Sequence, residues 1–140
     1  MIAYFDTSAL VPLIIDESGS ERAGRLWDQA DRVASVRLMY PEARAALAQA
    51  RRDNRLSSTA LRAAVKDLDD LAAQLDIVEL TEQLALRAGE LAEAHALRGY
   101  DAVHLAAAEQ LYDDDLVMVA GDSALLGAGE ILGFATAATS

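Results

Sequence analysis

Short apolar runs of strand length alternate with longer helix-like patterns along the whole chain. The strand-like runs are residues 2–5, 33–38, 76–80, 116–120 and 131–137. The helix-like patterns cover residues 20–30, 41–54, 58–75, 81–97 and 98–110. Strands separated by helices, in a chain with few hairpin signals, are typical of a parallel sheet with helices on both of its faces. We therefore expect an α/β fold, with one domain spanning residues 1–140.

Residues at the starts of the helical patterns support this division of the chain. Ser20 and Thr81 stand where N-caps are expected, and Ser58 and Thr59 open the pattern that they begin. Pro41 opens its own pattern, and we expect it at the first helical position, where its missing amide costs nothing.

Composition excludes several classes of protein and of site. An apolar fraction of 53% in 140 residues is enough to build a core. The absence of cysteine excludes disulfides, zinc–thiolate sites and thiol nucleophiles, so a metal would have to be held by oxygen atoms or by the two histidines. Asp6 interrupts the apolar N-terminal run, which also lacks a basic flank, and no stretch approaches the roughly 18 apolar residues of a membrane span. We expect a soluble, cytoplasmic protein.

Four acidic residues occupy similar places relative to the expected strands. Asp6 and Asp122 each follow a short apolar strand, Glu42 lies in the first turn of the helix after residues 33–38, and Asp101 opens the apolar helix that leads to the fourth strand. In open parallel sheets, ligands bind beyond the carboxyl ends of the strands. Each acid also has a simpler explanation as a turn, cap or dipole-favoured residue. Helix capping alone, however, does not require all four at the same kind of place.

Carboxylates that converge on one site repel each other unless a positive group lies between them. A hard divalent cation with oxygen ligands, Mg²⁺ or Mn²⁺, is the natural partner for such a group. These ions polarise phosphoryl oxygens and activate water for attack on them. The acidic residues therefore indicate hydrolysis of a phosphodiester.

Positive charge is concentrated in one segment of an otherwise acidic chain. The net charge of −11 argues against nucleic-acid binding through the overall field, so an RNA substrate would need a local basic surface. Five arginines gather between residues 37 and 55, namely Arg37, Arg44, Arg51, Arg52 and Arg55. Spacings of seven and four residues predict that Arg44, Arg51 and Arg55 share one helix face, which is either an RNA-binding surface or an ordinary solvated face.

The blocks FDTSAL (5–10), YDAVHLAAA (100–108) and GDSALL (121–126), with Glu42 between the first two, resemble the PIN-domain family. The likeness is to the VapC-type toxin ribonucleases of bacterial toxin–antitoxin pairs, and it covers nearly the whole chain. It implies a PIN-like three-layer α/β/α sandwich with a mainly parallel central sheet. It also implies a metal-dependent endoribonuclease, a small antitoxin that blocks the acidic site, and a homodimer.

The resemblance assigns roles to particular residues. It makes Asp6, Glu42, Asp101 and Asp122 the acidic quartet that binds Mg²⁺ or Mn²⁺ and carries catalysis. Thr7 or Ser8 would assist the water shell around the ion. The family often has Thr or Ser two residues before the last aspartate, where this chain has Ala120. Ser123 would then be the local hydroxyl group.

Other classes of protein fit the sequence less well. Haloacid-dehalogenase phosphatases need an aspartate where Ser8 stands, and response-regulator receivers need a lysine after a late strand, whereas the only lysine is Lys66. GAGEILG (127–133) precedes a strand, so it is not a dinucleotide-binding loop. His104 is interpreted as a packed core histidine, and His95 lies too far from it to share a metal. A PIN-like module that binds RNA or protein without cleaving RNA remains the alternative to an enzyme.

Overall fold

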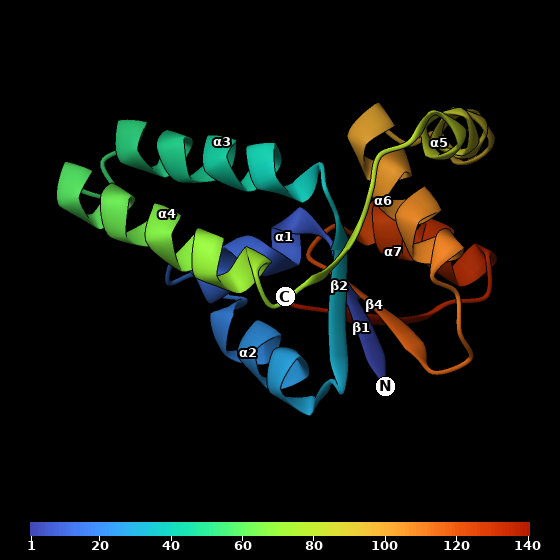
Figure 1. Cartoon of the computed structure of the whole chain (residues 1–140), viewed down its shortest axis with the longest axis horizontal. Helices are drawn as coiled ribbons and strands as arrows, with labels where there is room; N and C mark the ends of the chain where they lie inside the picture. The colour runs from blue at the N-terminus through green and yellow to red at the C-terminus, as the bar shows by residue number, and fades with distance from the viewer.

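A five-stranded parallel sheet runs through the centre of the computed structural model, which describes residues 1–140 (Figure 1). The strands are β1 (Ile2–Phe5), β2 (Arg32–Val36), β3 (Asp76–Val78), β4 (Leu116–Ala120) and β5 (Ala135–Ala138). Their order is β3-β2-β1-β4-β5, and every neighbouring pair is parallel. The chain builds the sheet outward from β1 in one direction and then from β4 in the other. The carboxyl ends of β1 and β4 are thus the point where the strand order reverses, which is where open α/β sheets bind ligands.

Helices cover both faces of the sheet. They are α1 (Thr7–Leu10), the 3₁₀ turn η1 (Val11–Leu13), α2 (Ser20–Gln29), α3 (Met39–Arg52), α4 (Ser58–Ala72), α5 (Glu82–His95), α6 (Gly99–Gln110) and α7 (Ser123–Ile131). Figure 1 shows α3 and α4 on one side of the strands and α5, α6 and α7 on the other. This arrangement confirms the expected three-layer α/β/α sandwich.

The central strand β1 supplies side chains to both hydrophobic cores. Ala3 and Phe5 belong to the core under α1 to α4, whereas Tyr4 belongs to the core under α5 to α7. Successive side chains of a strand point to opposite faces, so a strand between two helical layers must be apolar throughout. This requirement explains why residues 2–5 form a continuous apolar run.

Helix α6 is buried along most of its length. Seven of its twelve residues, from Asp101 to Ala108, are buried, and alanines allow it to pack closely against the sheet and α5. The apolar composition of residues 98–110 therefore reflects packing on several sides. None of the helices has the length and apolarity needed to cross a membrane.

Some element boundaries differ from those expected. Helix α3 begins at Met39, so Pro41 occupies its third position, where the amide also lacks a helical partner. The expected strand at residues 131–137 is wrong at its start, because α7 continues to Ile131 and the chain turns at Gly133, with φ of +92°. Strand β5 therefore begins only at Ala135. Ser20 lies inside α2, whose N-cap is Gly19, whereas Thr81 caps α5 as expected.

Candidate active site

Four carboxylates lie at the carboxyl edge of the sheet, and two basic side chains join them in pairs. We call Asp6, Glu42, Asp101 and Asp122 the acidic group. Asp6 and Asp122 follow β1 and β4, while Glu42 and Asp101 lie in the first turns of α3 and α6. His104 connects Asp6 with Glu42, and Arg98 connects Asp101 with Asp122. The structure thus gathers residues that are up to 116 positions apart in the sequence along one edge.

His104 holds the first pair of carboxylates from inside the core. Its Nε2 lies 2.7 Å from Glu42 Oε1 and 3.2 Å from Asp6 Oδ1. The histidine side chain is fully buried, and Asp6 is only 6% exposed. We call Asp6 and Glu42, together with the His104 that bridges them, the histidine-bridged pair. Desolvated carboxylates of this kind are stable only when paired, so His104 compensates for their burial.

Two hydroxyl groups fix the orientation of this histidine. The Tyr4 hydroxyl lies 2.9 Å from Nδ1, and Thr7 Oγ1 lies 3.1 Å from Nε2. Thr7 also donates a hydrogen bond of 2.8 Å to Glu42 Oε1. The Tyr4 and His104 rings meet edge to face, with centroids 5.9 Å apart. Both ring nitrogens therefore have a partner, and the imidazole has one defined position.

The acidic surroundings change the pKa of His104. Burial acts to lower this pKa, because it disfavours the charged ring, but the hydrogen bond to Glu42 and the charges of Asp6, Glu42 and Asp101 outweigh burial and raise it overall. The expectation that His104 is packed in the core is confirmed. Its contact with two carboxylates was not foreseen.

Arg98 holds the second pair of carboxylates from the solvent side. Its Nε donates to Asp101 Oδ2 at 3.0 Å, and its Nη2 donates to Asp122 Oδ2 at 3.2 Å. The guanidinium carbon lies 4.8 Å from the ring centroid of the exposed Tyr100. We call Asp101 and Asp122, together with the Arg98 that bridges them, the arginine-bridged pair. The Arg98 side chain is 63% exposed, so it can leave these carboxylates without disturbing the core.

Asp101 does not cap the helix that it was expected to open. The N-cap of α6 is Arg98, which makes no capping bond with its side chain, and Asp101 lies three residues later. Burial raises the pKa of Asp101, and the charges of Asp122 and Asp6 act in the same direction against the lowering effect of Arg98. The capping explanation is therefore wrong for Asp101. It does describe Asp6 and Asp122, whose carboxylates accept amides of α1 and α7.

Ser8 links the ends of the two central strands. Its hydroxyl donates to Asp6 Oδ2 and accepts a 2.8 Å hydrogen bond from the Gly121 amide. Ser123 is exposed and forms no side-chain hydrogen bond within the chain. Ala120 is fully buried in the core, so it offers no polar group to the edge.

The donor chemistry of the acidic group suits a hard divalent cation, because every ligand that it offers is a carboxylate oxygen. No three of the protein's acidic or histidine side chains, however, converge on a single point in the manner of a formed metal site. Instead, the side chains of Arg98 and His104 lie between the carboxylates of each pair. The residues fit Mg²⁺ or Mn²⁺ provided that the exposed Arg98 releases Asp101 and Asp122.

Comparison with known proteins identifies the family of this chain. The sequence profile of the PIN domain matches residues 3–124. The chain is also 48% identical over 124 residues to "Ribonuclease VapC45" of Mycobacterium tuberculosis (strain CDC 1551 / Oshkosh), covering 89% of this chain and 86% of that protein. The chain belongs to the VapC ribonuclease family of PIN domains.

Solved structures of PIN-fold toxins share the architecture. The VapC20 toxin of M. tuberculosis, described as cleaving the sarcin-ricin loop, superposes with a TM-score of 0.70 at 21% identity, over 91% of this chain and 95% of that one. VapBC-1 from nontypeable Haemophilus influenzae gives a TM-score of 0.64 at 16% identity, over 99% of this chain and 98% of that one. At these identities the likeness is one of fold.

The arginines of this PIN domain do not form the single helix face that their spacing predicted. Helix α3 ends at Arg52, and Asn54 adopts the left-handed conformation with φ of 62°, so Arg55 lies outside the helix. Arg55 approaches Glu17 at 3.4 Å.

The remaining arginines have separate partners. Arg51 donates to Ser58 at 3.2 Å, and Arg44 lies 5.7 Å from the Tyr40 ring centroid. Arg37 is paired with Glu79 at the β3 side of the sheet. Only Arg44 and Arg51 are therefore left on α3 from the predicted trio.

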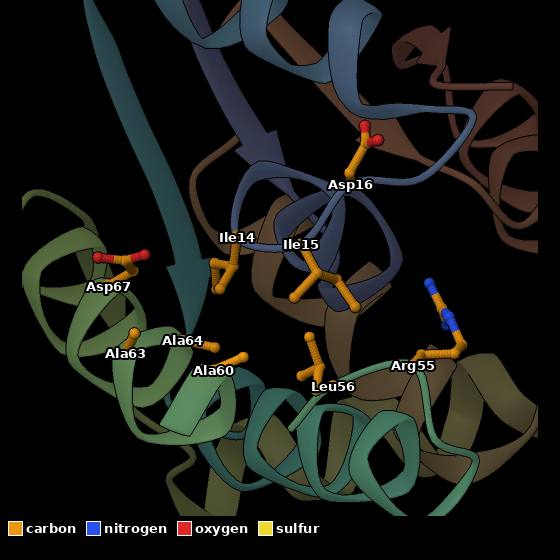
Figure 2. Close-up of a pocket in the computed structure, with 9 residues that line it drawn as sticks. All are labelled: Ile14, Ile15, Asp16, Arg55, Leu56, Ala60, Ala63, Ala64 and Asp67. Carbon is orange, nitrogen blue, oxygen red and sulfur yellow. The ribbon is translucent and has the colours of Figure 1, made fainter. Parts of the chain in front are cut away.

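An apolar cavity of about 380 Å³ lies apart from the acidic group in this PIN domain. Figure 2 shows Ile14 and Ile15 facing Leu56 and Ala60 of the α3–α4 hairpin across this cavity. None of its lining residues belongs to the acidic group. This cavity therefore does not contribute to the candidate site at the polar edge.

Two residues of this edge, Arg98 and His104, were not predicted to bind the carboxylates. Each lies three positions from Asp101, on either side of it, which is about one helical turn away. That spacing was the available signal for Arg98. The contact between His104 and Glu42, 62 residues apart, depends on tertiary packing.

Proposed function

We propose that this VapC-family protein is an endoribonuclease toxin that hydrolyses RNA at the acidic group with the help of Mg²⁺ or Mn²⁺. The observation that carries the proposal is that four carboxylates lie, in two bridged pairs, along the sheet edge where the strand order reverses. The 48% identity to a protein named as a ribonuclease supports RNA as the substrate.

In this proposal Asp6, Glu42, Asp101 and Asp122 hold the metal, together with the water shell that Thr7, Ser8 and Ser123 assist. A bound divalent ion supplies charge that polarises the scissile phosphate and activates water. His104 holds Asp6 and Glu42 in place, because its imidazole bridges them from the core. Asp101 and Asp122 would hold the ion only if Arg98 released them, and the guanidinium would then be free to bind an RNA phosphate.

The basic residues contribute to binding in the same proposal. Arg44, Arg51 and Arg55 contact RNA phosphates as separate positions on α3 and the following loop. Because the whole chain carries a net charge of −11, these local charges set where the strand approaches. The salt dependence of RNA binding reports how many of them contact phosphates.

The partners follow from relatives that were solved as complexes. Structures described as VapBC, or as a toxin–antitoxin complex from Klebsiella pneumoniae, share this fold. We include a VapB-type antitoxin that blocks the acidic group, a homodimer and a cytoplasmic location in the proposal. The proposal treats residues 1–140 as a single PIN domain.

Cleavage of total RNA by the purified, antitoxin-free protein tests the enzymatic part. The Asp6→Asn variant is expected to lose cleavage in Mg²⁺ or Mn²⁺ while keeping its melting temperature within a few degrees, because the shape of the side chain is retained. Asp16→Asn is the matched control, since Asp16 is an exposed aspartate of the same segment outside the acidic group. EDTA should abolish cleavage by the wild type and by the control.

The alternative is a PIN-like module that binds RNA or protein without cleaving it. It predicts that the wild-type protein in Mn²⁺ leaves total RNA intact, although it still binds RNA or a partner protein. Full activity of Asp6→Asn would instead remove Asp6 from the mechanism.

A further inference from the structure

A polar cavity of about 350 Å³ opens beside Asp122. It lies where the ends of β1 and β4 meet the start of α2 and the residues after β5, and its walls include Ser8, Glu17, Gly19, Gly121 and Thr139. Pro12 is the only apolar residue in its lining, and the lining has neither an aromatic nor a basic side chain. Its volume is at the lower end of the range for small-molecule sites, about 300–1,000 Å³.

Thr139 supplies a hydroxyl to this cavity that the fold itself does not use. The residue is only 4% exposed, and its amide continues the sheet by bonding to the Ala120 carbonyl at 3.1 Å. Its hydroxyl forms no side-chain hydrogen bond within the chain. No polar side-chain atom of the protein is both fully buried and unpaired. The Thr139 hydroxyl therefore meets the cavity, where a ligand or water must satisfy it.

Two glycines keep space open around this hydroxyl. A Cβ atom on Gly19 or on Gly121 would lie 3.3 Å from Thr139 Oγ1, which is tighter than ordinary van der Waals contact. Any larger residue at either position would press on the threonine and narrow the cavity. The backbone at both positions is thus close enough to shape a site around one hydroxyl.

The side chains that line the cavity suit the sugar of a nucleotide better than its base or its phosphate. A base normally stacks on an aromatic side chain, and none is present in the lining. A phosphate in the cavity would meet the Glu17 and Asp122 carboxylates directly, because their partners Arg55 and Arg98 lie outside the lining. A sugar hydroxyl, in contrast, donates to carboxylates and exchanges hydrogen bonds with the hydroxyls of Ser8 and Thr139.

We propose that this cavity binds a ribose of the RNA strand and that Thr139 contacts its 2′-hydroxyl. The proposal rests on the proposed ribonuclease function and deepens it, because it names the group that distinguishes RNA from DNA at this edge. Thr139 also places a hydroxyl beside the end of β4, next to the position where Ala120 offers none. Selection for RNA is therefore located at the end of β5.

The test compares binding of a fluorescein-labelled, random-sequence, single-stranded RNA with that of DNA of equal length, measured by fluorescence anisotropy in EDTA. Wild type should prefer RNA. Thr139→Val keeps the shape but removes the hydroxyl, so RNA affinity should fall about fivefold while DNA affinity stays unchanged. Thr139→Ser should retain the preference. Thr136→Val is the matched control, since Thr136 lies on β5, three residues before Thr139, but bonds to Glu130 outside the cavity.

Several results would overturn the ribose site: equal binding of RNA and DNA by the wild type, an equal loss for both polymers in Thr139→Val, or no loss at all. Melting curves establish that each variant is folded, and if Thr139→Val does not fold, Thr139→Ser and RNA with 2′-O-methyl riboses replace it. The methyl group blocks the proposed contact, so it should lower binding to wild type. Failure of cleavage in Mn²⁺ with RNA preference intact would contradict the proposed function alone. Cleavage without a Thr139-dependent preference would contradict only the ribose site.

Discussion

His104 and Arg98 each bridge two carboxylates, yet one is fully buried and the other has 63% of its side chain exposed. The carboxylates differ much less. Asp6 and Asp101 are 6% and 9% exposed, and Glu42 and Asp122 are 22% and 24% exposed. The two halves of the edge therefore differ in the cation and not in the acids. One cation is part of the core, and the other can be exchanged with solvent or with a metal ion.

Substitution of His104 or Arg98 by alanine should test the difference between the two halves most strongly. His104→Ala leaves two desolvated carboxylates and the Tyr4 hydroxyl without their partner, so it should lower the free energy of unfolding by about 3–5 kcal/mol. Arg98→Ala removes an exposed ion pair and should cost no more than about 1 kcal/mol. Urea denaturation in EDTA measures both values. Equal losses would show that exposure does not separate the two halves.

A smaller effect is expected from the hydroxyl that supports the histidine-bridged pair. Thr7→Val keeps the side-chain shape but removes hydrogen bonds to Glu42 and His104, which should cost about 1 kcal/mol of stability. Ser123→Ala should leave stability unchanged, because this exposed hydroxyl has no partner in the chain. Thermal melts of the two variants provide the comparison, and a larger loss from Ser123→Ala would contradict it.

The affinity for Mn²⁺ tests the same difference at the arginine-bridged pair. Arg98 competes with a divalent ion for Asp101 and Asp122, so Arg98→Gln should bind Mn²⁺ about threefold more tightly in calorimetric titration. Arg37→Gln removes a similar exposed ion pair, with Glu79, far from the acidic group and serves as the control. Weaker or unchanged Mn²⁺ binding by Arg98→Gln would mean that the arginine does not compete with the ion.

The smallest expected effect is a shallow dependence of stability on pH. The folded protein raises the pKa of His104 above its ordinary value near 6.5, because the nearby carboxylates outweigh the opposing effect of burial. A raised folded-state pKa contributes stability that is complete below the unfolded value and is lost as pH rises through the folded value. Unfolding measured in EDTA from about pH 6 upward should therefore show decreasing stability. His95→Gln should retain this dependence of stability on pH. Loss of the dependence in His95→Gln would show that it arises from His95 and not from His104.

The sequence predicts the layers and the positions of the acids because both depend on local pattern. Apolar runs of strand length required a covered sheet, and Asp6 and Asp122 directly follow two of these runs. The strand order was not predictable in the same way, since pairing of β1 with β4 joins residues more than 110 positions apart. A local pattern also extended one helix too far, past Arg52, and so placed Arg55 on a helical face.

The cations of the edge escaped prediction for a related reason. His104 was correctly interpreted as buried, but its partner Glu42 comes from another layer of the sandwich. Arg98 bonds with Asp122 across 24 residues, and Thr139 approaches two glycines from distant segments. Such contacts are set by how elements pack, which spacing along one element does not report.

The central place of β1 also has a consequence for protein synthesis. Of the five strands, the first to be synthesised lies in the middle of the finished sheet, and one of its neighbours, β4, is encoded more than 110 codons later. Until then one edge of β1 lacks its backbone partner, and Asp122 has not yet been made. A nascent or truncated chain that stops before residue 116 thus contains neither β4 nor the fourth carboxylate. The acidic group is therefore complete only once residue 122 has been added to the chain.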